Sequence, residues 1–330
     1  MKDLQKRRGT AIILITHDLG VVAGMSDRVH VMYAGKLVET GGVSDLFRAP
    51  AHPYTAGLLG SVPRLNSDTN RMTSAPLLDV RDLHKHFPVG QKGLFGGHKQ
   101  LLKAVNGVSF TLERGQCLGL VGESGCGKST VARAVVGLHP ATSGSIQFDG
   151  HELAGLSTRG WLPYRRKIQM IFQDPYASLD PRQTVSSILT EPTKIHGVSK
   201  PRERKLHAMQ LLEAVGLNPR HINRYPHEFS GGQRQRIGIA RALALEPELL
   251  ICDEPVSALD VSIQAQIINL MGELKERFNL SYLFIAHDLA VVRHICDAVA
   301  VMYLGRVVEQ ASRDEIFNDP QHPYTKSLLS

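Results

Sequence analysis

The chain has 330 residues, of which 42% are hydrophobic and 21% charged, a composition that is typical of globular proteins and excludes disorder as the main state. Four cysteines are too few for a disulfide scaffold, no apolar run approaches the ~18 residues of a membrane span, and the first ten residues lack the apolar core of a secretory signal, so we expect a reducing cytosolic compartment. The net charge of +7 comes from scattered Lys and Arg, which favours a modest surface excess over a nucleic-acid site.

An internal repeat divides the chain. Residues 1–60 align without a gap with residues 271–330, and 25 of the 60 pairs are identical. The offset of 270 residues is the size of a domain plus a linker and far too long for a solenoid repeat. We therefore expect residues 1–60 to be the C-terminal remnant of one domain, residues 61–76 to be a polar linker, and residues 77–330 to be nearly all of a second domain of the same kind.

The repeat also bears on the two ends of the chain. Met1 aligns with Met271, which lies inside a helical pattern, and a domain is not expected to begin halfway along a helix. We interpret the N-terminus as a truncation, an internal start or the edge of a fragment. The last residues stop at the position that matches Gly60, so the C-terminus is interpreted as incomplete too, and a non-catalytic fragment stays an alternative.

From residue 77 onward, short strand-like runs alternate with helical patterns. Strands are expected at 77–87, 102–113, 117–122, 167–172, 249–253 and 282–287, and helices at about 202–215, 232–246 and 260–278. This alternation predicts an α/β domain with a mainly parallel sheet. The first two strands alternate apolar and polar residues and indicate a small antiparallel layer, whereas residues 184–246 hold no strand candidate and indicate an inserted helical subdomain.

A glycine-rich segment, GESGCGKS, lies between a short apolar strand and a helix and fits the phosphate-loop pattern G-x-x-x-x-G-K-[ST]. Its glycines let backbone N–H groups surround phosphates, Lys128 can reach the β- and γ-phosphates, and the Ser129 hydroxyl can ligate Mg²⁺. The alternative is a strand–turn–helix junction that merely uses glycine, but a chance match to the full pattern is rare, and the position after an apolar strand and before a helix makes it rarer. The candidate nucleotide-binding residues are Gly122, Glu123, Ser124, Gly125, Cys126, Gly127, Lys128, Ser129 and Thr130.

Two acidic residues end the apolar strand LLICDEP. An Asp at the carboxyl edge of such a strand can hold Mg²⁺, and the next Glu can polarise an attacking water. We assign Asp253 to the metal and Glu254 to the general base. The alternative is an exposed strand end, which the upstream phosphate loop disfavours.

A second candidate anion site is the start of the helix after Ser230-Gly231-Gly232-Gln233. Serine is a good N-cap, and the glycines expose the amides of the first turn to an anion. Because the chain already has a complete phosphate loop, this segment either binds the same nucleotide from another subunit or is a plain helix cap.

These motifs, with Gln173 in IFQDP, SALD at 257–260 and His287, occur in the order that resembles the ATP-binding-cassette (ABC) ATPases. The resemblance covers roughly residues 77–330, with residues 1–60 as a partial copy. It implies a P-loop NTPase (ABC ATPase) core with an antiparallel β subdomain and an inserted α-helical subdomain, and ATP and Mg²⁺ as ligands. It also implies a head-to-tail dimer with a second cassette, whose Ser-Gly-Gly-Gln closes the site.

The resemblance further implies roles for single residues. Gln173 approaches Mg²⁺ and senses the γ-phosphate, Asp260 lies across the dimer interface, and His287 contacts the γ-phosphate and the attacking water. Phe87 matches in placement the aromatic that stacks on adenine, with a buried strand Phe as the alternative. His17, in the first copy, has no phosphate loop, acidic pair or Ser-Gly-Gly-Gln within its own copy and cannot build an ATP site alone.

Three further segments resemble the oligopeptide/dipeptide importer branch: DPYASLDPR at 174–182, RYPHEFSGGQRQR at 224–236 and two His-Pro-Tyr-Thr stretches. This branch implies a membrane permease contacted just after Gln173, an extracytoplasmic substrate-binding protein and a place on the cytoplasmic face of the plasma (inner) membrane, with no nucleic acid. The tandem arrangement most resembles the fused two-cassette subunits of glutathione importers, while other peptides and nickel chelates stay open. The rival class is an ABC protein acting on ribosomes or DNA.

Overall fold

A computed structural model describes residues 11–16, 22–23, 25–60, 75–89, 100–174, 178–198 and 200–330. The chain divides into two compact units, a small one made of residues 1–65 and 259–266 and a large one made of residues 66–258 and 267–330. His17 and positions 61–74 of the predicted linker lie outside the described residues.

The small unit is a two-stranded hairpin followed by two short helices. Its elements are β1 (Arg28–Tyr33), β2 (Lys36–Gly42), α3 (Val43–Arg48) and α4 (Pro53–Gly60). The strands pair antiparallel, and the turn residues Ala34 and Gly35 both have positive φ, 48° and 76°, which is the geometry of a type I′ turn. Val31 and Leu46 are the buried hydrophobic side chains of this unit among the described residues.

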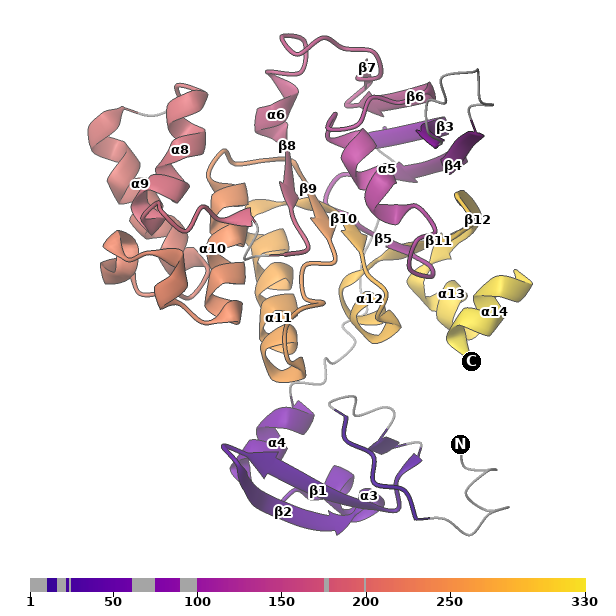
Figure 1. Cartoon of the computed structure of the whole chain (residues 1–330), viewed down its shortest axis with the longest axis vertical. Coiled ribbons are helices and arrows are strands. Elements are labelled where there is room, and N and C mark those ends of the chain that lie inside the picture. The colour runs from indigo at the N-terminus through magenta and orange to yellow at the C-terminus, as the bar shows by residue number, and fades with distance from the viewer. Residues whose placement is uncertain are drawn as a thin grey trace, which may run out of the picture. The chain divides into compact units, whose positions relative to one another are not determined.

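A six-stranded sheet forms the centre of the large unit, in the order β12-β11-β5-β10-β9-β8 (Figure 1). Its strands are β5 (Cys117–Val121), β8 (Ile168–Ile171), β9 (Leu249–Asp253), β10 (Ser281–Ile285), β11 (Ala298–Tyr303) and β12 (Arg306–Ser312). Neighbours from β11 to β8 run parallel, and β12 joins β11 antiparallel. Every residue of β5, β9 and β10 is buried, as expected for parallel strands that are covered on both faces.

A second, antiparallel sheet has the order β4-β3-β6-β7. Its strands are β3 (Leu78–Val89), β4 (Gln100–Leu112), β6 (Ser143–Phe148) and β7 (His151–Glu152). Helix α5 (Lys128–Val135) contacts both sheets, through β4 on one side and β9 and β10 on the other. Phe110 and Phe148 of this sheet share one hydrophobic core with Leu118 and Leu120 of β5. Burying each such side chain contributes about 1.5–3 kcal/mol, so the two sheets and α5 are held as one body.

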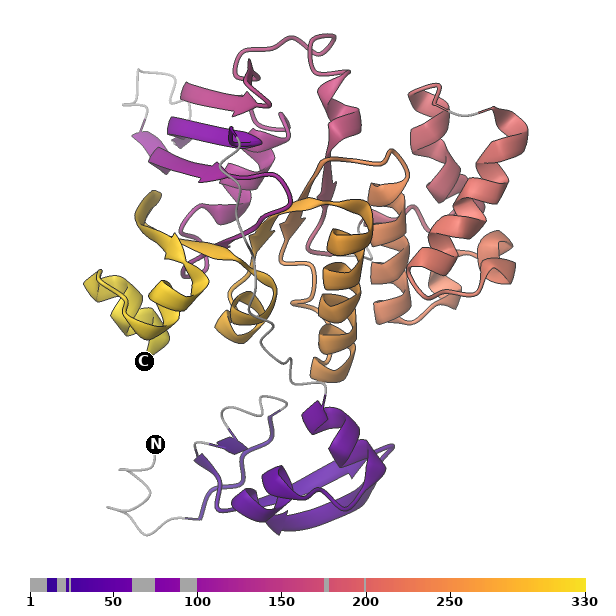
Figure 2. The ribbon, with the colours of Figure 1, turned by 180° about the vertical axis from the view of Figure 1, so that it is seen from behind.

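A helical segment is inserted between β8 and β9. It consists of α8 (Val185–Ile195), α9 (Pro201–Ala214), the 3₁₀ turns η1 (Pro219–Asn223) and η2 (Pro226–Glu228), and α10 (Gly231–Leu243). It starts at an N-cap where Thr184 Oγ1 accepts from Ser187 N (3.3 Å), and its last helix packs on β8. Both views place it beside the β8 edge, away from the antiparallel sheet (Figures 1 and 2).

The remaining helices border the central sheet. They are α6 (Tyr164–Lys167) before β8, α11 (Val261–Phe278) after β9, α12 (Leu289–Ile295) after β10, and α13 (Arg313–Asn318) and α14 (Pro323–Leu329) after β12. Helices α10 and α11 lie side by side in both views (Figures 1 and 2). Within the described part of the chain, no helix has the length and apolar content needed to cross a bilayer.

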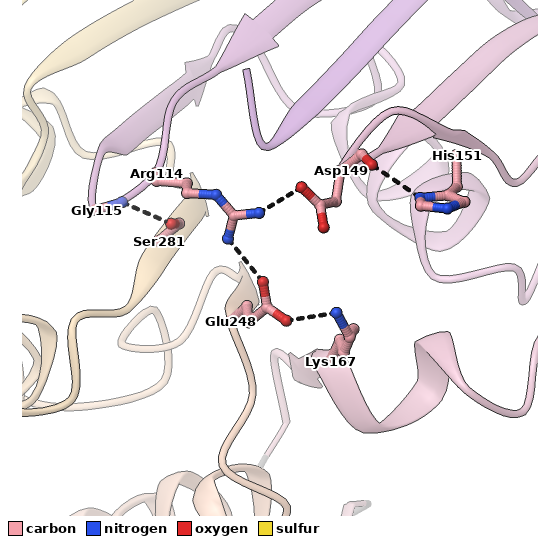
Figure 3. A network of polar contacts seen from close by, with 7 residues as sticks. All are labelled: Arg114, Gly115, Asp149, His151, Lys167, Glu248 and Ser281. Atoms are coloured by element: carbon pink, nitrogen blue, oxygen red, sulfur yellow. Dashed lines mark hydrogen bonds and ion pairs between the residues drawn. The ribbon is translucent and has the colours of Figure 1, made fainter. Parts of the chain in front are cut away.

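An ion-pair network joins the two sheets at the amino ends of the parallel strands (Figure 3). Arg114, just before β5, pairs with Asp149 of the antiparallel sheet's β6–β7 turn and, at 2.8 Å, with Glu248 before β9; Lys167 pairs with the other Glu248 oxygen at 2.8 Å. Partial burial raises the pKa of Glu248, but bonds from Lys167 and Arg114 outweigh it, so the pKa is lowered overall. Partly exposed pairs contribute ~0–1 kcal/mol each, so the network orients the sheets more than it stabilises them.

The predicted fold class is confirmed: an α/β core, an antiparallel β subdomain and an inserted helical subdomain are all present. Strands β6, β7, β11 and β12 were absent from the prediction. The run AVAVMY of β11 is buried at five of its six residues, like the predicted strands β5, β9 and β10, and β7 is only two residues long.

Candidate nucleotide-binding site

The predicted phosphate loop lies between β5 and α5, at the carboxyl edge of the central sheet. Two of its glycines are required by close backbone packing. A Cβ on Gly122 (φ 148°) would lie 2.1 Å from Met302 O, and one on Gly127 (φ 111°) would lie 2.2 Å from Ala104 O. Both contacts are far inside van der Waals distance, so the loop can keep this shape only with glycine at these positions.

The Lys128 side chain lies under the loop, and the residue is 4% exposed. Its Nζ donates to two loop carbonyls, Gly122 O at 2.7 Å and Glu123 O at 2.9 Å. A buried ammonium needs such partners because burial without them costs several kcal/mol. The loop therefore curls around a fixed positive charge.

The tip of the loop is exposed at Glu123, Ser124 and Gly125, whereas Thr130 on the first turn of α5 is half-buried. Cys126 is buried, as predicted, and burial is the main cause that raises the pKa of its thiol above the ordinary value. Every described cysteine is free and buried, which agrees with small interior residues.

The predicted metal residues Ser129 and Asp253 are in direct contact. Ser129 Oγ donates to Asp253 Oδ1 at 2.8 Å, across from α5 to the end of β9. Asp253 is 2% exposed; burial is the largest cause acting on the pKa of its carboxyl and raises it, while the Ser129 bond lowers it. Two oxygen donors thus lie together beside the phosphate loop.

Glu254, Gln173 and His287 form a cluster next to this pair. Gln173 Nε2 donates to Glu254 Oε2 at 2.9 Å, and His287 Nδ1 lies 3.3 Å from the same oxygen. Glu254 has φ +47°, a left-handed conformation that costs a non-glycine residue about 1–3 kcal/mol, and its N–H donates to Ile285 O at 3.0 Å. The Glu254 carboxylate therefore lies at the carboxyl ends of β9 and β10, and the backbone of this residue is kept in a strained conformation by the bond to Ile285.

Two predicted segments make local bonds of their own. Ser230 Oγ accepts from Gln233 N at 3.4 Å and Ser230 N donates to Gln233 Oε1 at 3.0 Å, so the segment with Gly231 and Gly232 is a capping box of α10. Asp260 Oδ1 accepts from Ser262 Oγ (2.7 Å) and Ile263 N (3.0 Å) before α11. Contacts within one chain do not test the role that either segment is predicted to have in a partner's site.

Phe87 lies near the end of β3, opposite Leu102 of β4, and is half-buried. Its ring meets the His139 ring edge to face with centroids 5.7 Å apart, and Lys85 Nζ lies 5.0 Å from its centroid. Lys85 thus lies over one face of the Phe87 ring. Stacking of Phe87 on adenine stays a prediction.

Two contacts to the phosphate loop were missed by the sequence reasoning. Glu123 N donates to Tyr324 Oη at 3.0 Å, and Gly305 N donates to Cys126 O at 2.9 Å. Tyr324 belongs to the second His-Pro-Tyr-Thr stretch and Gly305 to the turn between β11 and β12. Both segments were visible as repeated sequence, but nothing in the repeat places them beside residues 122–127.

This arrangement defines a nucleotide-binding cassette: a phosphate loop at the end of a parallel strand, an acidic pair two strands away and an inserted helical subdomain. The model for the ABC transporter family matches residues 105–257. The model for the oligopeptide/dipeptide transporter C-terminal region matches residues 38–86 and 308–330, that is, parts of both copies of the repeat. The chain belongs to the ABC transporter family, in the branch that carries this C-terminal region.

Within that branch, the chain is similar to glutathione import ATP-binding proteins. The protein from Pectobacterium atrosepticum is 49% identical over 353 aligned positions, which cover 99% of this chain and 56% of the relative. The protein from Salmonella typhimurium is 48% identical over 356 positions, covering all of this chain and 57% of the relative. The chain therefore spans about half the length of the curated relatives it matches.

Two solved cassettes have the same fold. The ATP-binding cassette MJ0796, in a dimeric post-hydrolysis state with ADP and phosphate, has a TM-score of 0.64 at 27% identity and covers 72% of this chain and 98% of its own. The protein cbiO1 of Clostridium perfringens, part of the ABC transporter complex cbiONQ, has a TM-score of 0.64 at 28% identity and covers 74% of this chain and 92% of its own.

Proposed function

We propose that the chain is the ATP-binding and ATP-hydrolysing motor subunit of an ABC-type importer for peptides. The observation that carries the proposal is the meeting of the phosphate loop, the Ser129–Asp253 pair and the Glu254–His287 pair at one edge of the central sheet. A structural loop would need glycines for packing, but it would not need a buried lysine, a buried aspartate and a strained glutamate beside them.

The phosphate loop and α5 supply the binding groups for the ATP phosphates. Lys128 brings a positive charge, and backbone N–H groups of residues 125–130 are the donors that a helix start presents to an anion. Phe87 is the residue we propose to contact the adenine.

Ser129, Asp253 and Gln173 are the residues that would hold the Mg²⁺ that accompanies ATP. Their hydroxyl, carboxylate and amide oxygens are the hard donors that Mg²⁺ prefers, and this ion usually takes only one or two protein carboxylates beside phosphate oxygens and water. No group of three or more His, Cys, Asp or Glu that could hold a metal occurs among the described residues, which fits such a site. The ion supplies positive charge to the phosphates.

Glu254 is proposed as the general base and His287 as the group that holds the γ-phosphate and orients the water. Glu254 Oε2 already accepts a bond from Gln173 and faces His287, so one oxygen joins the two polar side chains. The carboxylate then removes a proton from water as the water attacks the terminal phosphorus. Because Gln173 contacts the base and directly precedes in sequence the segment proposed to face the permease, it can report the nucleotide state outward.

A second cassette is needed to close this site. We propose that Ser230–Gln233 of the partner cassette offer the amides at the start of α10 to the nucleotide, and that Asp260 lies across the interface. We also propose that residues 1–60 and 77–330 derive from two such cassettes joined by residues 61–76.

The C-terminal region match and the relatives support a peptide importer on the cytoplasmic face of the inner membrane, with permease subunits and, indirectly, an extracytoplasmic binding protein. The relatives' names favour glutathione over dipeptides, longer peptides or nickel chelates as the cargo.

The test is the steady-state ATPase rate and ATP affinity of the purified full chain. Lys128→Ala should lower ATP affinity by at least about 100-fold, because the buried charge is lost from the phosphates. Glu254→Gln should bind ATP normally but turn over at least about 100-fold more slowly. A wild-type rate in Glu254→Gln would overturn the base assignment, and a folded chain that neither binds nor hydrolyses ATP would favour the non-catalytic alternative.

A further inference from the structure

We propose that Tyr324 and the β11–β12 turn brace the phosphate loop, so that the C-terminal helix α14 sets the loop shape on which nucleotide affinity depends. The affinity part of this inference rests on the proposed function. Tyr324 is a positioning residue in this scheme, because it acts on the nucleotide through the loop.

The brace holds the tip of the loop at two points. Tyr324 Oη accepts a hydrogen bond from Glu123 N at 3.0 Å, and Gly305 N donates to Cys126 O at 2.9 Å. The two bonds have opposite direction and flank residues 124 and 125, which are both exposed. Both braces come from the last 30 residues of the chain, which the nucleotide-binding motifs do not include.

The bond to Tyr324 and a bond to Lys128 are both made by the backbone of Glu123. Glu123 donates its N–H to Tyr324, and its carbonyl accepts from Lys128 Nζ at 2.9 Å. The Tyr324 bond therefore restricts rotation of the peptide segment that also positions the lysine. Cys126 N donates to the same Glu123 carbonyl at 3.3 Å, so removing the Tyr324 bond loosens, without fully freeing, the residue that supplies one of the two carbonyl acceptors of Lys128.

Tyr324 is itself held rigidly. Its N–H donates to His322 Nδ1 at 3.1 Å, and His322 N donates to Glu309 Oε2 at 3.0 Å. Its ring packs on Tyr303 with centroids 4.3 Å apart and an interplanar angle of 37°. Burial is the main cause that raises the pKa of the Tyr324 phenol, so the hydroxyl is neutral at physiological pH.

The small unit shows that this arrangement forms without a phosphate loop. Tyr54 N donates to His52 Nδ1 at 3.1 Å, His52 N donates to Glu39 Oε2 at 3.0 Å, and the Tyr54 and Tyr33 rings lie 4.4 Å apart at 35°. Contacts within its own segment are thus enough to set the position of Tyr324, and the phosphate loop is not needed for it. A residue that positions the loop must itself be held in this way, and a Tyr324→Phe variant distinguishes such a role from an incidental packing contact.

The experiment compares Tyr324→Phe with its matched control Tyr54→Phe in the full chain. Each variant loses one hydroxyl and keeps its ring pair, so Tyr324→Phe should lose at most the contribution of one hydrogen bond to its stability and remain folded. Two quantities are measured: amide hydrogen exchange of residues 122–127 without nucleotide, and the Kd and kcat for MgATP. Tyr324→Phe should exchange faster and bind about fivefold more weakly, the size expected for one hydrogen bond, with a smaller change in kcat. Tyr54→Phe should match the wild type in both.

Equal loop exchange in Tyr324→Phe and wild type would overturn the brace, whether or not the chain binds ATP. Unchanged affinity together with faster exchange would overturn the claim that the brace sets affinity. If no variant and no wild-type sample binds MgATP, the proposed function fails, while the exchange result still decides the brace. Equal effects of Tyr324→Phe and Tyr54→Phe would also contradict the proposal, because a local tyrosine effect would then explain both.

Discussion

The hairpin β1–β2 of the small unit and the hairpin β11–β12 of the large unit have the same strand register. Arg28 pairs with Gly42 where Ala298 pairs with Ser312, and the irregularity falls between Val31 and Met32 in one hairpin and at the matching step in the other. The ring pairs also correspond, as do the hydrogen bonds that Glu39 and Glu309 accept from His52 N and His322 N. Local geometry is therefore encoded in the 25 identical pairs of the repeat.

Burial differs sharply between the two hairpins. Met302 is completely buried and Met32 is 61% exposed, and β11 is buried at five of six residues where β1 is buried at one. The reason is that β11 pairs with β5 on its second edge and lies in the core of the large unit. A strand's sequence can thus set its twist and turn, while its contribution to stability depends on the neighbours it finds.

The prediction with the largest expected effect concerns His17 and His287, which occupy matching positions in the two copies of the repeat. His287→Ala should lower kcat by about 100-fold or more, the range for loss of a polar group that acts on the attacking water. His17→Ala should leave kcat unchanged, because its copy of the repeat has no phosphate loop or acidic pair in this chain. Steady-state ATPase assays decide this, and equal losses in the two variants would show that both copies take part in catalysis.

The second prediction concerns Met32 and Met302, which occupy matching positions in the two hairpins. Met302→Ala should destabilise the large unit by about 2–4 kcal/mol, because it removes a completely buried side chain and opens a cavity beside Gly127. Met32→Ala should change stability by less than about 0.5 kcal/mol. Urea unfolding followed by the single tryptophan, Trp161 of the large unit, measures the first effect, and calorimetry measures both. A large loss in Met32→Ala would mean that the small unit hides this residue in solution.

The smallest expected effect comes from a buried charge of the large unit. Burial, the largest cause, raises the pKa of Asp253 in the folded protein, so the folded state holds this proton more tightly than the unfolded state. The stabilising proton is present below the unfolded pKa of about 3.9 and is lost as pH rises through the folded pKa. Between about pH 4 and 7, wild-type stability should therefore fall relative to Asp253→Asn. Melting temperatures of the nucleotide-free proteins across this range check it, and parallel curves would contradict it.

Much of the fold could be predicted because periodicity and turn residues are local properties. Runs such as LLICD and SYLFI were recognisable as buried strands, and the phosphate loop and acidic pair follow directly from their ends. Strand β7 was missed because two residues carry no pattern, whereas the run AVAVMY of β11 is as apolar as the predicted strands and was absent from the prediction without a local reason.

The sequence predicted which residues form the candidate site better than it predicted the contacts between them. Sequence reasoning grouped Ser129 with Asp253 as metal ligands, and these side chains are in contact. It did not find that Gln173 and His287 share one oxygen of Glu254, or that Tyr324 touches the loop. Such contacts join residues between 33 and 201 positions apart, and only the packing of the sheet determines them.

Strand β5 has consequences for how the chain is made. It is the first strand of the central sheet to be synthesised, but its two neighbours, β10 and β11, begin at residues 281 and 298. Sheets built from such distant pairings have high contact order and fold slowly, and their unpaired edges are exposed to aggregation while they wait. On the ribosome, the phosphate loop that follows β5 thus emerges well before the strands and the tyrosine that hold it, so the loop can acquire its braced form only after residue 324 has been synthesised.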